Sequence, residues 1–262
     1  MFDEALQNAG SVAASKRAFL RENPLGYFIA SMLAGVYVGL GIILIFAIGG
    51  PLAGAGHPAQ RLVMGASFGI ALTLVVFAGS ELYTGNTLFM SLGWLRNEVK
   101  LKDLGLVWLV SWIGNLIGAL ALSWLVVQAG SLLHAQSFIQ TVSGAKMTTP
   151  AHVLFASGVL CNLLVCLALW TASRTKADTA KILLINLCLF AFIASGFEHS
   201  IANMTLLGIG VLYRAGTDLS WAGYFYNLLW VTLGNTLAGA VILAGAYHLM
   251  AKRETNKKGH TI

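Results

Sequence analysis

Long stretches without any charged side chain dominate the pattern along the chain. Asp, Glu, Lys and Arg are absent from residues 23–60, 62–80, 104–145, 147–173 and 219–251. Residues 82–95 are also uncharged and extend the second run beyond Glu81, while 182–213 is interrupted only by Glu198. Because about 20 apolar residues span a bilayer core, we predict six membrane-spanning segments, near 27–50, 62–83, 104–130, 151–173, 182–200 and 222–250.

The composition agrees with that pattern. Of the 262 residues, 57% are hydrophobic and 10% are charged, whereas an average soluble domain carries about 25% charged residues. Such a balance excludes a water-facing surface, so we expect an all-α membrane protein with a single transmembrane domain over 1–262. The first 22 residues contain charges but no apolar core of a signal peptide, so we expect no cleaved leader.

Residues 1–22 and 251–262 flank the spans and hold many of the charges. In the first segment, apolar residues recur at near-helical spacing: Phe2, Leu6, Val12, Phe19 and Leu20. This spacing is typical of an amphipathic helix on the membrane surface, but a frayed polar terminus also fits. The second segment is predicted to be a polar tail.

The distribution of basic residues predicts the topology. Thirteen of the 16 Lys and Arg residues lie in the N-terminal segment, in the loops after spans two and four, or in the C-terminal tail. The alternate loops hold only Arg61, Lys146 and Arg214. The positive-inside rule therefore places both termini in the cytoplasm. The net charge of +6 reports this topology and gives no reason to expect a nucleic-acid partner.

The cysteines give no sign of a metal site. Cys161, Cys166 and Cys188 all lie within predicted spans, where a free thiol packs as a small hydrophobe. No metal-ligand spacing is present. We therefore expect neither a metal nor an organic cofactor.

The two halves of the chain resemble each other. Residues 79–86 and 196–203 each have a Gly two positions before a Glu and an Asn five positions after it, which aligns Glu81 with Glu198 and Asn86 with Asn203. Gly114-Asn115 and Gly234-Asn235 repeat at almost the same offset. With three spans in each half, the second half must enter the membrane from the opposite side. The sequence thus predicts two inverted repeats, over 27–130 and 151–250, as in transporters and channels.

Glu81 and Glu198 are the only acidic residues at the predicted membrane depth, and both lie among Gly, Ser and Asn. Backbone leaves helical geometry at this depth only where it lines a cavity or is buried in protein. We therefore expect spans two and five to be broken, with half-helices meeting near the bilayer midplane. Each carboxylate could accept hydrogen bonds from N–H groups freed by its break. We favour this structural role, and a proton relay stays open.

Three stretches carry a family resemblance: SELYTGN at 80–86, CNLLVCLALW at 161–170 and SGFEHSIANM at 195–204. They resemble the formate/nitrite transporter family, and its nitrite channels in particular. The resemblance covers all six spans. It implies an aquaporin-like protomer in a bacterial inner membrane, a homopentamer with one pore per protomer, and conduction of small monovalent anions.

The resemblance also implies roles for particular residues. His199 is similar to the central pore histidine, Thr84 to the threonine facing it, and Asn162 to its hydrogen-bonding neighbour. Lys146 is similar to a lysine near the pore centre that attracts anions. On its own terms, an ionisable residue inside a membrane indicates a functional site, although a core histidine bridging two helices is an alternative. Lys146 alone would be interpreted as a solvated loop lysine.

Two hydrophobic constrictions are implied in the same way. Phe68 and Leu72 are expected to line one, and Leu82 and Phe192 the other. Phe68 and Leu72 are four residues apart and share a helical face. Without the resemblance, such a stripe indicates ordinary packing.

The function predicted from these observations is a channel for weak-acid anions, most of all nitrite, in which His199 protonates the anion. Formate, hydrosulfide and an ion-coupled secondary transporter are the alternatives. A different class, an intramembrane serine protease, is suggested by Gly65-Ala66-Ser67-Phe68-Gly69. That motif needs a strand-turn-helix context, and here it lies in an apolar helical segment. A water channel is disfavoured because none of the four prolines lies near a predicted break.

Overall fold

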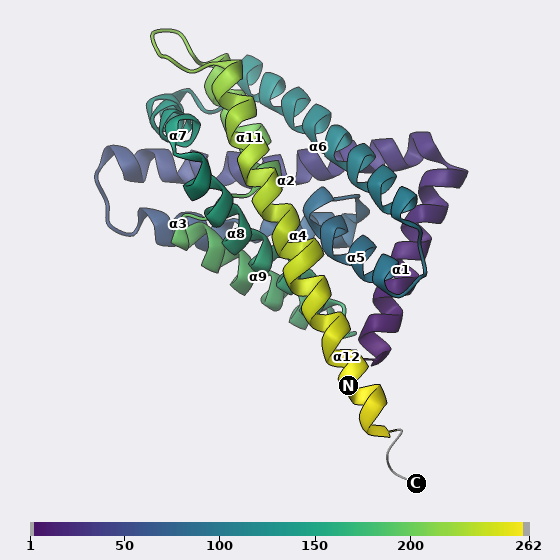
Figure 1. Cartoon of the computed structure of the whole chain (residues 1–262). Helices are drawn as coiled ribbons and strands as arrows, with labels where there is room; N and C mark the ends of the chain where they lie inside the picture. The colour runs from purple at the N-terminus through teal and green to yellow at the C-terminus, as the bar shows by residue number, and fades with distance from the viewer. Residues whose placement is uncertain (1–2, 259–262) are drawn as a thin grey trace.

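The computed structural model describes residues 3–258, and side chains as far as Ala251. Every regular element in these residues is helical (Figure 1). Phe2 and the last residues of the predicted tail lie outside the described part. In chain order the elements are α1 (Asp3–Glu22), α2 (Pro24–Gly54), α3 (Gln60–Ser67), α4 (Ile70–Leu74), η1 (Val75–Gly79), α5 (Tyr83–Leu95), α6 (Leu101–Ala129), η2 (Leu133–Ala135), α7 (Gln136–Thr148), α8 (Ala151–Ala172), α9 (Asp178–Ser195), α10 (Ser200–Leu212), α11 (Trp221–Thr236), η3 (Leu237–Leu243) and α12 (Ala244–Lys258).

Six helical segments are long and apolar enough to cross a membrane. They are Pro24–Gly54, Gln60–Gly79, Leu101–Ala129, Ala151–Ala172, Asp178–Ser195 and Trp221–Ala251. The second combines α3, α4 and the π-helical turn η1, and the last combines α11, η3 and the start of α12. Each overlaps one of the six spans predicted from hydropathy. The all-helical class and the number of spans are therefore confirmed.

Two short helices, α5 and α10, follow the second and the fifth of these segments, each after a few non-helical residues. Glycine turns the chain out of the preceding helix in both places, because Gly79 has φ +80° and Gly196 has φ +73°, a region that other residues adopt at a cost. The backbone is then extended at Leu82 and His199, the N-cap residues of α5 and α10. Both short helices are buried along nearly their whole length, which places them inside the helical bundle.

The long helices pack in pairs, α2 against α6 and α8 against α11 (Figure 1). Glycine allows the first pair to approach closely, since a Cβ at Gly118 would collide with the Met32 carbonyl. In the second pair, a Cβ at Gly234 would collide with the Phe155 carbonyl. Small residues at helix contacts are the usual device for tight packing in membranes. Gly114 and Gly118, four residues apart on α6, both meet α2 in this way.

The N-terminal segment is a helix, so the alternative of a frayed terminus is wrong. However, the apolar residues of α1 predicted to lie on the membrane pack on the protein. Leu6 is buried, Val12, Phe19 and Leu20 pack against apolar clusters, and α1 contacts α5 and α2. Leu6 shares an apolar cluster with Ala251. The two ends of the described chain therefore lie together (Figure 1).

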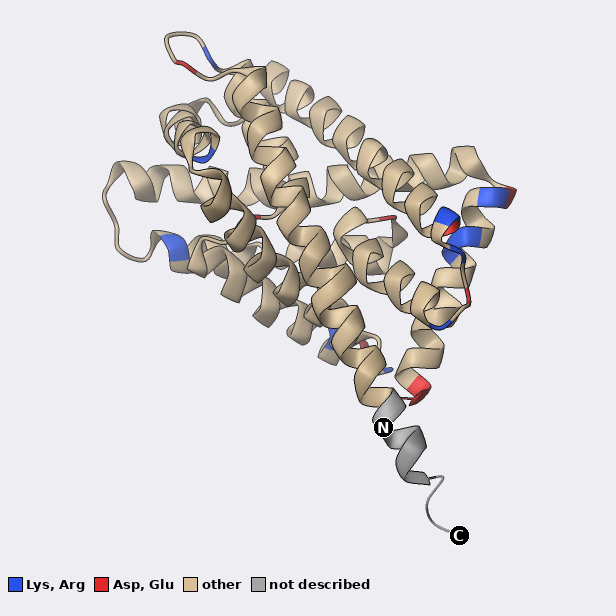
Figure 2. Ribbon diagram, in the orientation of Figure 1, with Lys and Arg blue, Asp and Glu red and all other residues tan. Residues whose placement is uncertain are grey.

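Figure 2 shows where the charges lie. Basic ribbon segments gather at the edge formed by α1 and the start of α6, whereas the long helices are almost uncharged. That separation is the three-dimensional form of the pattern along the sequence.

Candidate functional site

Two buried asparagines hold the non-helical residues in place. Asn115 of α6 donates to the carbonyls of Ser31 (2.7 Å) and Glu81 (2.9 Å), and its Oδ1 accepts from the Tyr83 N–H (3.0 Å). The Glu81 N–H donates in turn to the Ala30 carbonyl (3.1 Å). One side chain thus satisfies both a carbonyl and an N–H that the helix end leaves without partners.

Asn235 of α11 makes the corresponding set of bonds in the second half. It donates to the carbonyls of Gly158 (2.7 Å) and Glu198 (3.1 Å) and accepts from the Ser200 N–H (2.9 Å). Neither asparagine was among the predicted site residues. The repeated Gly-Asn pair was their signal in the sequence.

The two glutamates bond to side chains rather than to freed backbone N–H groups, so the predicted partners were wrong. Glu81 Oε2 accepts from Lys16 Nζ (2.7 Å), Tyr27 OH (2.9 Å) and Asn86 Nδ2 (3.2 Å). All of these partners lie on the side of the molecule that contains α1. Lys16 was not identified as a site residue from the sequence.

Glu198 follows the same scheme. Its Oε1 accepts from Lys146 Nζ (2.6 Å) and its Oε2 from Asn203 Nδ2 (2.6 Å). Asn203 also donates to Asn227 Oδ1 (2.8 Å), which links α10 to α11. Lys146 belongs to α7 and not to an irregular loop, and its charge is compensated by Glu198.

His199 and Thr84 lie opposite each other, as the resemblance implied. His199 is the N-cap residue of α10, and its Nδ1 accepts from the Ala202 N–H (3.1 Å). Because a backbone N–H can only donate, Nδ1 carries no proton, and the neutral ring must hold its proton on Nε2. Nε2 lies 3.0 Å from Thr84 Oγ1. The ring therefore donates to the threonine hydroxyl, and both groups are buried.

Asn162 supports the threonine and not the histidine ring. Its Nδ2 lies 2.6 Å from the Asn235 carbonyl, 3.1 Å from Thr87 Oγ1 and 3.4 Å from the Thr84 carbonyl, three acceptors that share its two N–H groups. The expected bond to the ring is absent from the hydrogen bonds of the described residues. The Ala202 N–H and Thr84 orient His199 instead.

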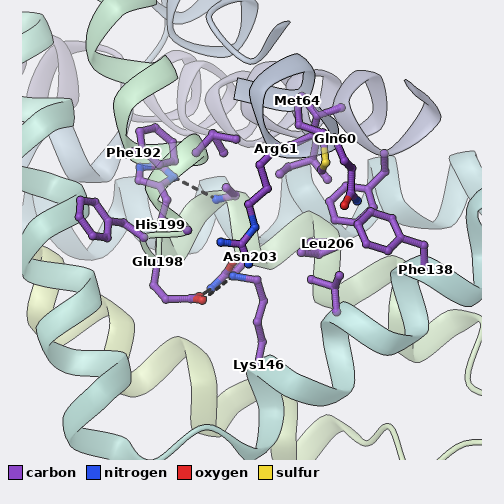
Figure 3. A pocket seen from close by; sticks show the side chains of 18 residues that line it. Gln60, Arg61, Met64, Phe138, Lys146, Phe192, Glu198, His199, Asn203 and Leu206 are labelled. Carbon is purple, nitrogen blue, oxygen red and sulfur yellow. Dashed lines mark hydrogen bonds and ion pairs between the residues drawn. The ribbon is translucent and has the colours of Figure 1, made fainter. Parts of the chain in front are cut away.

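A cavity of about 280 Å³ opens on one side of His199 (Figure 3). Its walls are mostly apolar, and its polar lining comes from Gln60, Arg61, Lys146, Glu198, His199 and Asn203. In Figure 3 the Arg61 side chain extends into the cavity towards Glu198 and Asn203. We refer to this space as the Arg61 cavity.

The charges of the Arg61 cavity do not cancel. Lys146 is paired with Glu198, whereas Arg61 has no carboxylate within ion-pair distance among the residues that the structure describes. One positive charge is left over. The sequence marked Arg61 only as the single basic residue between spans one and two, with nothing to distinguish it from a solvated loop residue.

A much smaller apolar cavity, of about 10 Å³, also borders His199. Phe68, Leu72, Leu82 and Phe192 all line it, together with His199, and its volume is about that needed for one water molecule. The rings of Phe68 and Phe192 pack edge to face with centroids 5.5 Å apart. The four residues predicted to form two constrictions thus line one small cavity, and the two phenylalanines contact each other there. Phe192 and His199 border both cavities.

The protease motif has no hydrolase geometry. Ser67 lies in α3, and its Oγ donates to the Val63 carbonyl one turn earlier (2.9 Å). A nucleophile elbow requires a sharp strand-to-helix turn. As for metals, the described residues contain no group of three or more His, Cys, Asp or Glu that could hold an ion.

Comparisons with known proteins agree on one family. The model of the formate/nitrite transporter family matches residues 3–249. The nitrite transporter NirC of Salmonella typhimurium is 48% identical over 252 residues, covering 94% of this chain and 91% of that protein. A solved FNT family ion channel superposes with a TM-score of 0.88 at 46% identity, covering 93% and 97% of the two chains. A pentameric formate channel with formate bound gives a TM-score of 0.77 at 26% identity, covering 86% and 96%. The chain is a multi-pass membrane protein of the formate/nitrite transporter family, a family of transporters and not of enzymes.

Proposed function

We propose that this protein is a channel for weak-acid anions, nitrite above all, in the bacterial inner membrane. The NirC likeness supports nitrite, and the formate-bound relative supports formate as a second substrate. The observation that carries the proposal is His199, which is paired with Thr84 and borders both the cationic Arg61 cavity and the small apolar cavity. The pentameric relative supports a homopentamer, and we propose one pore in each chain.

We also propose that the two halves are inverted repeats and that spans two and five are broken helices. The matching bonds of Asn115 and Asn235 support this, as do the positive φ angles of Gly79 and Gly196. Each repeat would contribute one short buried helix, α5 or α10. The Arg61 cavity would then face outward, and both termini would face the cytoplasm.

The first step of the proposed mechanism is capture of the anion. The unpaired guanidinium of Arg61 attracts an anion into the cavity, where the charge of Lys146 is already compensated. Beyond it, Phe68 and Phe192 form an apolar barrier. An isolated charge in such surroundings is strongly disfavoured. The anion must therefore lose its charge before it crosses.

His199 is placed to supply the proton. Water in the Arg61 cavity relays a proton from the bulk solution to Nδ1, and Nε2 passes its own proton to the anion, so the ring is neutral with its proton on Nδ1. Nδ1 then returns this proton to the water while Nε2 takes one up, which restores the starting tautomer and leaves a net transfer of one proton from solution to the anion. The neutral acid then crosses the constriction. Because Nδ1 caps α10, its protonation breaks the bond from the Ala202 N–H, at a cost of about 1 kcal/mol. The charge of an anion beside the ring offsets this cost.

The test compares anions of weak and strong acids. We would measure nitrite, formate and chloride flux in proteoliposomes for wild type and His199→Asn. Asparagine is an effective N-cap, so the variant keeps the start of α10 while it removes the titrating ring. Selective loss of nitrite and formate flux is expected. Equal flux in both proteins, or equal loss of all three anions at matched assembly, would contradict proton transfer by His199.

A further inference from the structure

A second basic cavity lies at the edge where α1 meets the start of α6, and it shares no lining residue with the Arg61 cavity. It has a volume of about 500 Å³. Its lining consists of Arg17, Leu20, Arg21, Lys100, Lys102, Asp103, Leu106, Val107 and Val110. Figure 2 shows this edge as the main concentration of basic ribbon in the molecule. We refer to it as the α1–α6 pocket.

The charges of this pocket are not compensated by the protein. Four basic side chains and one carboxylate line it, which gives a net charge of +3. The ion pairs formed by the described residues are Lys16–Glu81, Lys146–Glu198 and Lys181–Asp178, and none involves these four cations. Asp103 accepts from the Lys100 N–H (3.1 Å) and so caps α6.

One donor in the pocket is buried without an acceptor. Arg17 Nε has almost no accessible surface and no hydrogen-bond partner within the described part of the chain. A buried donor left unpaired is costly. Because protein atoms enclose Nε, a ligand in the pocket would meet the guanidinium through its terminal N–H groups. Phosphate is an anion that such groups bind in bidentate fashion.

The rest of the lining selects the source of that phosphate. Leu20, Leu106 and Val110 form an apolar wall below the cations, and on α6 the exposed apolar surface continues through Leu109, which is 57% exposed, and Ile113. A free phosphate ion would meet the cations and leave this wall unused. A phospholipid places its phosphate at the cations and its acyl chains along the wall.

We propose that the α1–α6 pocket binds the phosphodiester of an anionic phospholipid. The site needs only that this edge lies at a membrane surface, and basic pockets between membrane helices are suited to such headgroups. Binding would tie α1 to α6 at the point where neither helix offers the other a countercharge. The proposal is independent of proton transfer at His199, so either can fail alone.

Native mass spectrometry of the purified, delipidated protein tests the proposal. The probes are phosphatidylglycerol, phosphatidylcholine and inorganic phosphate, titrated into wild type, Arg21→Gln, Lys102→Gln and the control Lys176→Gln, an exposed lysine of another loop. We expect phosphatidylglycerol to bind at least tenfold more tightly than phosphatidylcholine. Each pocket change should weaken it about fivefold, since one basic residue near a membrane surface contributes about 1 kcal/mol, and the control should leave it unchanged.

Four results would overturn the proposal. Equal binding of the two lipids would remove the need for an anionic headgroup, and equal weakening by Lys176→Gln would show that only net charge matters. Displacement of the lipid by millimolar inorganic phosphate would identify the pocket as a site for the free ion. Unchanged lipid binding in both pocket variants, with a less stable oligomer, would mean that a neighbouring subunit covers the pocket.

Discussion

Replacing Asn235 with leucine should destabilise the protein more than any change at an exposed polar residue. Asn235 is fully buried, and its three bonds satisfy the Ser200 N–H and the carbonyls of Gly158 and Glu198. Leucine has a similar size, so it removes these bonds without opening a large cavity. The Ser200 N–H and the Glu198 carbonyl are then unpaired, whereas the Gly158 carbonyl keeps its helical bond within α8. The change therefore isolates the hydrogen bonds.

The magnitude follows from those bonds. Hydrogen bonds between membrane helices have measured contributions of about 0.6 kcal/mol each, which gives a lower estimate of about 2 kcal/mol. Leaving a buried backbone group unsatisfied costs about 1–3 kcal/mol, which gives roughly 2–6 kcal/mol for the Ser200 N–H and the Glu198 carbonyl together. We expect a loss of about 3 kcal/mol in the free energy of unfolding. Asn115→Leu should cost nearly the same, because Asn115 is equally buried and makes three corresponding bonds.

The assay is unfolding in mixed micelles with increasing SDS, followed by circular dichroism. Asn186→Leu is the control, since the amide of Asn186 donates only to the Ile182 carbonyl one turn away. Asn235→Leu within about 0.5 kcal/mol of this control would refute the argument, because that is the range of ordinary surface changes. A large cost at Asn235 with none at Asn115 would refute the proposed equivalence of the halves.

Other predictions concern transport and topology. Arg61→Gln should raise the anion concentration for half-maximal flux about two- to fourfold at low salt, since a charge roughly 5–8 Å away in water contributes about 0.5–0.8 kcal/mol. The control is Arg214→Gln, a change at an exposed cation outside the cavity. The same rise in this control would contradict a specific role for Arg61. Phe192→Ala should admit chloride by opening the constriction, as measured in liposomes, whereas unchanged selectivity, or equal leakage with Phe190→Ala, would remove its role as a barrier. A cysteine at Lys100 should react with a membrane-impermeant reagent only in inverted vesicles, and labelling in intact cells would reverse the topology.

The spans could be predicted because hydropathy is a local property. A charge-free run of about 20 residues has one stable place, the bilayer core, and the six segments of the structure coincide with six such runs. The interruptions in the helices had a local signal too, since Gly79 and Gly196 adopt positive φ. The lysines that pair with the two glutamates had no such signal.

The partners of the site residues depend on contacts between distant segments. Glu81 pairs with Lys16, 65 positions earlier, and Glu198 with Lys146, 52 positions earlier. The two separations differ, so the repeat that aligned the glutamates could not align the lysines. Phe68 and Phe192 meet for the same reason, through the packing of α3 against α9. Such pairings follow from the assembled fold and not from spacing along the chain.

Changes at Glu198 can separate a structural role from a proton relay. Glu198→Gln alone keeps the shape but leaves Lys146 without a countercharge and turns an amide donor towards either Lys146 or Asn203, so either role predicts loss of stability. The double change Glu198→Gln with Lys146→Met removes both charges together, which is often nearly neutral for a buried ion pair. If the carboxylate only supports the fold, the double variant should regain stability and retain pH-dependent nitrite flux. Restored stability with lost pH dependence would instead assign the relay to Glu198, because a side chain that cannot bind and release a proton would then have interrupted the path while the pore stayed intact.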